Sequence, residues 1–346
     1  MSTEVKSHAR AVLIVAVFAL ALLLSPCSTF QQANTQNSRM PAQSQSADQQ
    51  SARRVADSRF WIRVRGRERT AVFTEDGVLK KELSRMPPWS ELSPDGSRLL
   101  EVRFANGASD LFVSDADGSH ARKIARGVSF QDEAHWSHDG KRVLYARGFH
   151  VLEADARGAV LRKFARGDEV VTEPLYTPDG RVSYILKHFP KGPRPPHSDN
   201  FVVIKKRLPA DIVVTDGATE SVVVEDRPIR TYAWDSSGQR LAFSTYDDGG
   251  HIVTRDLADG TERVVKLSDI DERLGGFVAH DIRWRPDGGA VAFTLSFTGG
   301  SEKGDKTKYF GDDQLFVLYP DGRATWFDVG ETYSIFDWIP TDNLPE

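Results

Sequence analysis

The chain has 346 residues, and its 45 lysine and arginine residues nearly balance 49 aspartate and glutamate residues, giving a formal net charge of −4. This balance provides no basic face for nucleic acid, so we expect no nucleic-acid partner. The single cysteine excludes an intrachain disulfide, and a hydrophobic content of 40% with seven tryptophans and nineteen phenylalanines is typical of a packed globular protein.

The first 28 residues have the pattern of a signal peptide or membrane anchor. Lys6, His8 and Arg10 precede an uncharged run at residues 11–24, which is short for a membrane span. The run leads to Cys27, where a bacterial lipoprotein would carry its acylated cysteine, although Pro26 differs from the small residue of a lipobox. Cleavage, lipidation at Cys27 and retention as an anchor all stay open, and each places the rest of the chain outside the cytoplasm.

Residues 29–57 are rich in Gln, Ser, Asn and Ala and hold almost nothing to bury, so we expect a disordered linker. The folded domain is expected to occupy residues 58–346. Its first segments, at residues 60–64, 71–74 and 79–83, are predicted to be short β-strands.

A five-residue motif recurs along the folded part of the chain. Its clearest copy is Trp136-Ser137-His138-Asp139-Gly140, in which a large apolar residue precedes a turn whose glycine supplies a positive φ. The apolar first positions of the copies are Leu92, Trp136, Tyr176, Trp234, Trp284 and Trp338, at intervals of 40 to 58 residues. A period of about 40–50 residues with several strands per unit is typical of a β-propeller.

Each repeat is predicted to form one blade of four antiparallel strands. In the first complete unit, the strand that ends at Leu92 is followed by strands at residues 98–102, 110–114 and 121–125, with turn residues between them. The later units have the same order of strands and turns, as in a WD-like repeat.

The last blade is predicted to be split between the two ends of the domain. A strand at residues 333–338 would complete the three strands between residues 59 and 83. Such a closure ties the ring together and removes a free sheet edge. We therefore expect an all-β fold, a six-bladed β-propeller closed by N-terminal strands plus one C-terminal strand.

Two blades carry insertions between their second and third strands, at residues 187–200 and 298–313. The first is rich in proline and the second in glycine and charge, so both are read as exposed contact loops on the face that holds the mouth of the central channel. The candidate contact residues in these loops are His188, Lys191, Arg194, His197, Lys303 and Lys306.

The array of motifs resembles the repeat of TolB-like propellers over roughly residues 59–340. The motif at Trp136 and the turn Ser114-Asp115-Ala116-Asp117-Gly118 carry the resemblance best. It implies an extracytoplasmic, periplasmic protein that binds partner proteins, although TolB has an α/β domain where this chain has the linker. The same repeat occurs in propellers attached to prolyl-oligopeptidase-type hydrolases, but the chain contains no Gly-x-Ser-x-Gly motif.

Polar residues that lie three or four positions before each anchor are expected to surround the channel mouth. The set comprises Asp132, Glu133, Thr172, Glu173, Arg230, Thr231, His280 and Asp281, with Trp89 and Ser334 completing the ring. A divalent cation would find oxygen ligands in its four carboxylates and a nitrogen ligand in His280. The alternative, which we favour, is a hydrated channel whose carboxylates pair with Arg230.

Two further patterns are interpreted structurally. The Asp-x-Asp-Gly turn lacks the later Glu of an EF-hand calcium loop, so its aspartates are expected to serve the hairpin. The aromatic anchors Trp136, Tyr176, Trp234 and Trp284 repeat once per blade and are expected to pack between blades rather than to form a sugar-binding platform.

Taken together, these features favour a monomeric, extracytoplasmic scaffold for protein partners, attached to the membrane through its N-terminus alone. No catalytic residue and no cofactor are assigned, since no spacing marks a nucleophile with its base. The alternative is a metal-assisted lyase or hydrolase, or a ligand receptor, that uses the channel mouth.

Overall fold

The computed structural model describes the chain at residues 59–65, 69–83, 86–87, 90–105, 108–128, 134–165, 169–188, 208–297, 314–329 and 335–343. All of these belong to one compact unit, Ser51–Glu346. The expected export signal, Cys27 and the whole of the predicted linker lie outside the described residues.

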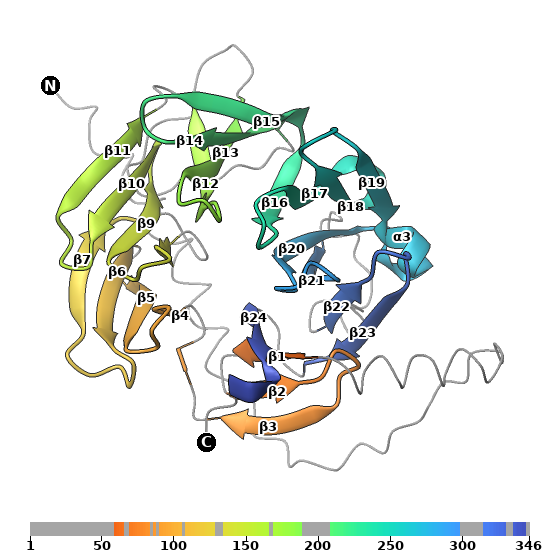
Figure 1. Ribbon diagram of the computed structural model, residues 1–346, viewed down its shortest axis with the longest axis horizontal. Helices are drawn as coiled ribbons and strands as arrows, with labels where there is room; N and C mark the ends of the chain where they lie inside the picture. Colours follow the sequence, from red (N-terminus) through yellow and green to blue (C-terminus); the bar gives the residue numbers. More distant parts are fainter. Residues whose placement is uncertain are drawn as a thin grey trace, which may run out of the picture. The chain divides into compact units, whose positions relative to one another are not determined.

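The described strands form six antiparallel sheets of four strands, arranged as the blades of a ring (Figure 1). This arrangement confirms the predicted all-β, six-bladed propeller. In each blade, the strand that is first in the predicted repeat lies nearest the centre of the ring and its partners follow outward (Figure 1).

Blades 1 to 3 consist of β4 (Ser90–Leu92), β5 (Arg98–Ala105), β6 (Ala108–Asp115) and β7 (Arg122–Arg126); β8 (Ala134–Trp136), β9 (Arg142–Arg147), β10 (His150–Asp155) and β11 (Val160–Ala165); and β12 (Val170–Tyr176), β13 (Val182–Lys187), β14 (Ala210–Thr215) and β15 (Glu220–Arg227). Blades 4 and 5 consist of β16 (Ile229–Trp234), β17 (Arg240–Thr245), β18 (His251–Asp256) and β19 (Glu262–Lys266); and β20 (Phe277–Trp284), β21 (Val291–Phe297), β22 (Gln314–Leu318) and β23 (Ala324–Asp328). Blade 6 consists of β24 (Ile335–Pro340), β1 (Phe60–Arg65), β2 (Thr70–Phe73) and β3 (Leu79–Leu83).

The recurring motif forms the tight turn between the first two strands of a blade. In blade 2, Gly140 has a φ of 64° and its N–H donates to the carbonyl of Ser137. The Ser137 hydroxyl donates to Asp139 at 2.5 Å, and that carboxylate accepts the N–H of Lys141 at 3.0 Å. Glycine is favoured at this φ because it has no Cβ, and Ser and Asp satisfy the turn's polar groups.

Blade 6 is closed by the C-terminal strand, as predicted. β24 pairs with β1 in an antiparallel register that runs from Phe60 opposite Pro340 to Arg65 opposite Ile335. An ion pair between Arg63 and Asp337 crosses the two strands, and Phe336 is fully buried. The strand begins and ends two residues later than the predicted 333–338.

The hydrophobic core is divided into clusters, and each joins neighbouring strands of two blades. One cluster packs Ile185 and Ile212 of blade 3 against Tyr232 and Phe243 of blade 4, and all four residues have 0% of their surface exposed. Burial between blades rather than within a single sheet accounts for the repeat, because one sheet alone leaves both faces open.

The aromatic anchors are not equally buried. Trp136 and Tyr176 are buried between blades, as predicted, whereas Trp234 and Trp284 are only partly buried. The indole N–H of Trp234 reaches back to the Ser183 hydroxyl at 2.9 Å, and Trp284 lines a cavity between blades 4 and 5. Both still pack against clusters that join two blades, as predicted, but as partly buried members of those clusters.

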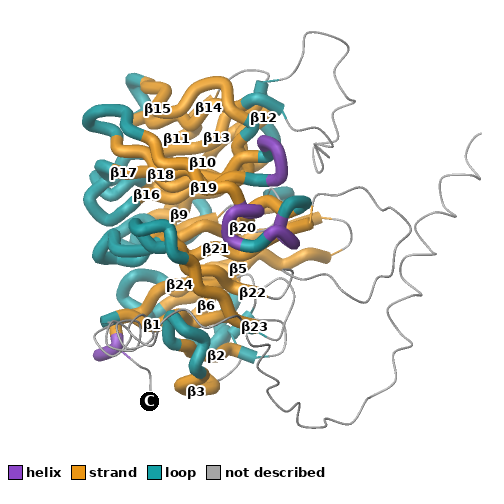
Figure 2. The backbone as a smooth tube through the Cα atoms, turned by 90° about the vertical axis from the view of Figure 1, so that its right-hand side faces the viewer, coloured by secondary structure: helices purple, strands orange, loops and turns teal. Residues whose placement is uncertain are grey.

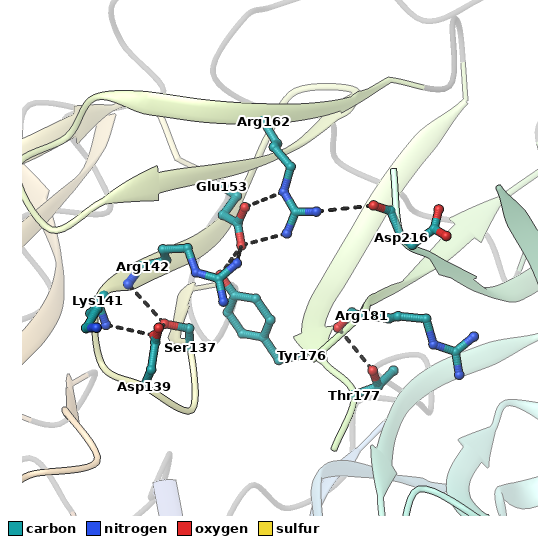
Figure 3. Close-up of polar contacts among 10 residues, drawn as sticks. All are labelled: Ser137, Asp139, Lys141, Arg142, Glu153, Arg162, Tyr176, Thr177, Arg181 and Asp216. Atoms are coloured by element: carbon teal, nitrogen blue, oxygen red, sulfur yellow. Dashed lines mark hydrogen bonds and ion pairs between the residues drawn. The ribbon is translucent and has the colours of Figure 1, made fainter. Parts of the chain in front are cut away.

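A buried carboxylate joins blades 2 and 3 (Figure 3). Glu153 of β10 is 1% exposed and accepts hydrogen bonds from Arg142 at 2.9 Å, from Arg162 at 2.5 Å and from the Tyr176 hydroxyl at 2.9 Å. Arg162 also donates to the carbonyl of Asp216 in blade 3. Burial by itself raises the pKa of Glu153, but the bonds from Arg162 and Tyr176 outweigh it and lower the pKa.

The connections within the ring differ in length. In the side view, short turns follow one edge of the ring, and the helical turn α3 (Leu267–Ile270) lies toward the other (Figure 2). Both insertions fall between second and third strands, as predicted, but the first extends to Pro209 because β14 begins only at Ala210. Among the described residues, no helix has the length and apolar character to cross a membrane.

Candidate functional site

The first strands of three successive blades each carry a β-bulge. The pairing register shifts by one residue at Glu173 in β12, at Arg230 in β16 and at Asp281 in β20. A bulge interrupts the ladder of hydrogen bonds and redirects the side chain, and bulges are over-represented beside functional sites. All three residues belong to the set that the sequence analysis expected at the channel mouth.

Two of these bulges hold a carboxylate residue in the left-handed region of φ. The φ of Glu173 is 52° and that of Asp281 is 44°. Non-glycine residues seldom adopt such values, which cost on the order of 1–3 kcal/mol each unless the surroundings enforce them. Both residues lie inside their strands, Glu173 as the fourth residue of β12 and Asp281 as the fifth of β20.

Glu173 connects blade 3 to blade 4. One oxygen of its carboxylate lies 3.4 Å from Nη1 of Arg230, and the other accepts the Thr231 hydroxyl at 3.3 Å. The side chains of Glu173 and Arg230 keep 17% and 25% exposure, so both also face solvent. The structure thus places the Glu173 carboxylate beside Arg230, as the hypothesis of a hydrated channel with paired charges expects.

His280 follows in blade 5, one residue before the bulge at Asp281. Burial, reinforced by the positive charges of Arg230 and Arg283, lowers the pKa of His280 to about 3. The imidazole is therefore neutral at physiological pH, with one nitrogen able to donate and the other to accept.

Asp281 extends the cluster to blade 6. Its side chain is 2% exposed and pairs with Nη2 of Arg283 at 2.7 Å, while the N–H of Phe336 in β24 approaches its other oxygen at 3.5 Å. The sequence analysis missed Arg283. An arginine two residues after a candidate acid on the same strand was the available signal, because such residues share a face of a strand.

We call Glu173, Arg230, Thr231, His280, Asp281 and Arg283 the bulge cluster. It joins the inner strands of blades 3 to 6. Asp132, Glu133, Trp89 and Ser334, the remaining expected mouth residues apart from Thr172, lie outside the described residues. Within the described ranges, no group of three or more His, Cys, Asp or Glu residues is arranged to hold a metal ion.

His188 is the one candidate loop residue that the structure describes, and it lies at the start of the first insertion. Its ring atoms Nδ1 and Nε2 lie 3.0 Å from Glu169 and 3.0 Å from Asp211, respectively. Its backbone N–H donates to the carbonyl of Pro209. The two ends of the insertion therefore meet at His188. Lys191, Arg194, His197, Lys303 and Lys306 lie outside the described residues.

Comparisons with known proteins place this fold among solved propellers. No protein-family model matches the chain, and no curated protein matches it. TolB from Acinetobacter baumannii is similar in structure, with a TM-score of 0.55 and 14% identity over 82% of this chain and 66% of that chain. A chain of the nidogen/laminin complex gives a TM-score of 0.51 and 9% identity over 81% of this chain and 98% of that one.

The match with TolB spans just under two thirds of the TolB chain. Identities this low establish the fold alone. The described part of the chain is thus a six-bladed β-propeller similar in structure to that of TolB.

Proposed function

We propose that this protein is a non-catalytic scaffold that works outside the cytoplasm, tethered by its N-terminus, and binds a partner protein at the bulge cluster. The observation that carries the proposal is the set of bulges at Glu173, Arg230 and Asp281 in three successive inner strands. Each bulge interrupts the hydrogen-bond ladder of an inner strand, which costs stability. A binding role explains why three successive blades keep this irregular backbone.

The chemistry of the cluster suits a polar protein partner. Glu173, Arg230 and Arg283 keep between 17% and 29% of their side-chain surface exposed. Glu173 and Arg230 hold each other in position, and Asp281 holds Arg283. Charged groups held in this way give specificity and orientation to an interface more than raw affinity. The neutral His280 adds a donor and an acceptor beside them.

The first test uses photo-crosslinking in the source organism with the full chain. A photoreactive amino acid in place of Arg283 is expected to capture one discrete protein. The same amino acid at Val222, 47% exposed on the outer strand β15, is the matched control and should capture none. The same yield from both positions would contradict a partner at the bulge cluster.

A charge swap separates binding from structure. Glu173→Arg combined with Arg230→Glu preserves an ion pair between blades 3 and 4 but reverses the charges that a partner meets. The double variant should keep the wild-type melting temperature and lose the crosslink at Arg283. Retention of the crosslink would show that these charges do not recognise the partner.

Export and tethering rest on the N-terminal pattern and on the resemblance to TolB. Membrane fractionation of the full chain should recover it with the envelope, and protease added outside the cytoplasmic membrane should degrade it. Labelled palmitate incorporated by the wild type and absent from Cys27→Ala would identify lipidation as the anchor. Recovery in the cytoplasmic fraction would refute export.

The alternative of a metal-assisted lyase or hydrolase, or a ligand receptor, uses the same residues. It gains support from His280, whose neutral imidazole is the form that binds metal ions. Metal analysis of the purified full chain distinguishes the two hypotheses. A stoichiometric divalent metal that is lost in Glu173→Gln and in His280→Gln would favour the alternative over the scaffold.

A further inference from the structure

A cavity of about 310 Å³ lies between blades 4 and 5, and none of its lining residues belongs to the bulge cluster. Its polar lining includes Arg240 at the start of β17, Thr254 on β18, Arg263 on β19 and Trp284 at the end of β20. Ile252, Val265, Val291 and Leu318 provide apolar walls. Cavities of about 300–1,000 Å³ with apolar walls and a few convergent polar groups are typical of small-ligand sites.

The lining of this cavity corresponds, position by position, to the buried cluster between blades 2 and 3. In the strand register of blade 2, Arg142 lies opposite Asp155 and Glu153 lies opposite Arg162. In the strand register of blade 4, Arg240 lies opposite Asp256 and Thr254 lies opposite Arg263. Arg240 therefore corresponds to Arg142, Arg263 to Arg162 and Thr254 to Glu153, while Trp284 and Tyr176 are the anchors of the following blades.

The two interfaces differ in one group, the carboxylate. Between blades 2 and 3, Arg142, Arg162 and the Tyr176 hydroxyl all donate to Glu153 (Figure 3). Between blades 4 and 5, Thr254 replaces the acid, and a cavity lies among the three corresponding donors. A hydroxyl on a short side chain cannot accept from two guanidinium groups that are placed for a carboxylate.

The three donors around the cavity have one protein acceptor between them, Asp235. Within the described ranges, the side chain of Arg263 forms no hydrogen bond or ion pair, and Arg240 donates through its Nε alone, to Asp235 at 3.0 Å. The indole nitrogen of Trp284 is buried without a partner. A buried donor without an acceptor is uncommon, so the Trp284 nitrogen indicates a missing acceptor. Arg263 is exposed and the Arg240 side chain is 37% exposed, so both arginines also reach solvent.

Two aspartates also line the cavity, but both serve the turn between β18 and β19. Asp256 accepts the N–H of Ala258 at 2.8 Å, and Asp259 accepts the N–H of Thr261 at 2.8 Å. Arg255, the third lining arginine, is paired with Glu262 at 2.8 Å. The lining therefore carries three arginines against two aspartates that are engaged in the turn, and it has an excess of positive charge.

Blade 1 shows how the corresponding donors are satisfied where no carboxylate lies between them. Arg98, Arg122 and Trp136 occupy the corresponding positions there, with Val113 in place of Glu153. Each of the three donates to a backbone carbonyl, of Gly140, Ala156 and Glu91 respectively. Of the three interfaces with this triad, the one between blades 4 and 5 is the one in which the ring N–H of the anchor is buried without an acceptor.

We propose that the cavity between blades 4 and 5 binds a small organic carboxylate with an apolar body. The carboxylate takes the place that Glu153 fills between blades 2 and 3 and accepts from Arg240 and Arg263. The aliphatic or aromatic body packs against Ile252, Val265 and the Trp284 ring. The site is independent of the scaffold function proposed for the bulge cluster.

Calorimetric titration of the full chain with phenylacetate, indole-3-acetate and hexanoate tests the proposal. At least one acid should bind with 1:1 stoichiometry and at least tenfold more tightly than phenylacetamide, which has the shape of phenylacetate without the charge. Inorganic phosphate, an anion without an apolar body, should bind at least tenfold more weakly than that acid. No saturable binding by any of the three acids, or equal binding of acid and amide, overturns the proposal.

Substitutions connect the binding to the cavity. Arg263→Gln should weaken the acid at least tenfold, whereas Arg122→Gln, the corresponding change in blade 1, should leave its affinity unchanged. Thr254→Glu supplies the acid from within, so it should abolish binding and raise the melting temperature. A Thr254→Glu variant that folds and still binds the acid as tightly as the wild type overturns the proposal, as does equal weakening by Arg263→Gln and Arg122→Gln.

Discussion

The guanidinium carbon of Arg98 lies 4.7 Å from the centre of the Trp136 ring in the next blade. The same arrangement recurs where Arg142 lies 5.8 Å from Tyr176 and where Arg240 lies 4.7 Å from Trp284. The arginine that follows the turn of one blade thus covers the anchor of the next. Such cation–π contacts, together with the burial of the rings, link adjacent blades of the ring.

Trp136→Ala should destabilise the propeller by about 3–5 kcal/mol, because it empties a buried site between blades 1 and 2. Trp284→Ala should cost clearly less, since that ring is partly exposed and already borders a cavity. Chemical denaturation of both variants measures the difference. Trp326→Ala, at a ring that is 42% exposed, is the control and should change stability by no more than about 0.5 kcal/mol. Equal losses at positions 136 and 284 would contradict the difference in burial.

Glu153→Gln should destabilise the protein by about 3 kcal/mol. The substitution keeps the shape of the side chain but leaves Arg142 and Arg162 without the buried charge that both contact. Urea denaturation at pH 7 measures the loss. Glu82→Gln removes the partner of Arg69 in a pair that is 40% and 59% exposed, and it should cost less than about 1 kcal/mol. A similar effect of the two changes would mean that Glu153 is not the centre of its cluster.

Deletion from residue 333 onward should lower the melting temperature sharply or cause aggregation, because β1 loses the partner strand that closes blade 6. Phe336→Ala isolates the packing contribution of that strand and should cost about 3–5 kcal/mol, as this ring is fully buried. Thermal melts of the two variants provide the measurement. A truncated chain as stable as the full one would disprove closure through β24.

Stability near neutral pH should fall as the pH rises through the titration of His188. Burial lowers the pKa of His188, but the hydrogen bonds that its imidazole donates to Asp211 and Glu169 outweigh it, so the folded pKa is raised above 6.5. Protonation of the folded state therefore contributes stability that is fully present below about pH 6.5 and is lost above the folded pKa. His188→Gln should flatten this part of a plot of melting temperature against pH. An unchanged slope would show that the imidazole is not held between two carboxylates.

His280 should contribute the opposite slope. Its folded pKa of about 3 lies below the unfolded value of 6.5, so between these pH values the unfolded chain binds a proton that the folded chain does not. Stability should thus fall as the pH decreases below about 6.5. The loss of unfolding free energy between pH 7 and pH 5 should be smaller in His280→Asn than in the wild type. Equal losses in the two proteins would argue against a desolvated imidazole beside Arg230 and Arg283.

The architecture was predictable because its signals are local. A turn such as Ser137 to Gly140 is specified by residues that contact each other within one hairpin, and the spacing of the copies gives the number of blades. Even the closure by β24 followed from the count, since three N-terminal strands required a fourth. The second-to-third-strand position of both insertions was predicted in the same way.

The arrangement of the candidate site was decided by the tertiary structure. Glu173, Arg230 and Asp281 were chosen by their distance from the anchors, but a bulge is a mismatch between two strands, and neither strand alone specifies it. Arg283 was missed although its spacing of two residues from Asp281 was visible in the sequence, and the ion pair between the two became evident only in the structure.

The contrast between Glu153 and Thr254 shows the limit most clearly. In the sequence, each is one residue in a third strand of similar pattern. Strand pairing within blade 2 brings Arg142 and Arg162 to Glu153, and the packing of blade 3 adds Tyr176. The packing of blade 5 against blade 4 leaves a cavity at Thr254. Contacts between blades join residues from separate strands and hairpins, so their energy depends on the assembled ring and is absent from the repeat itself.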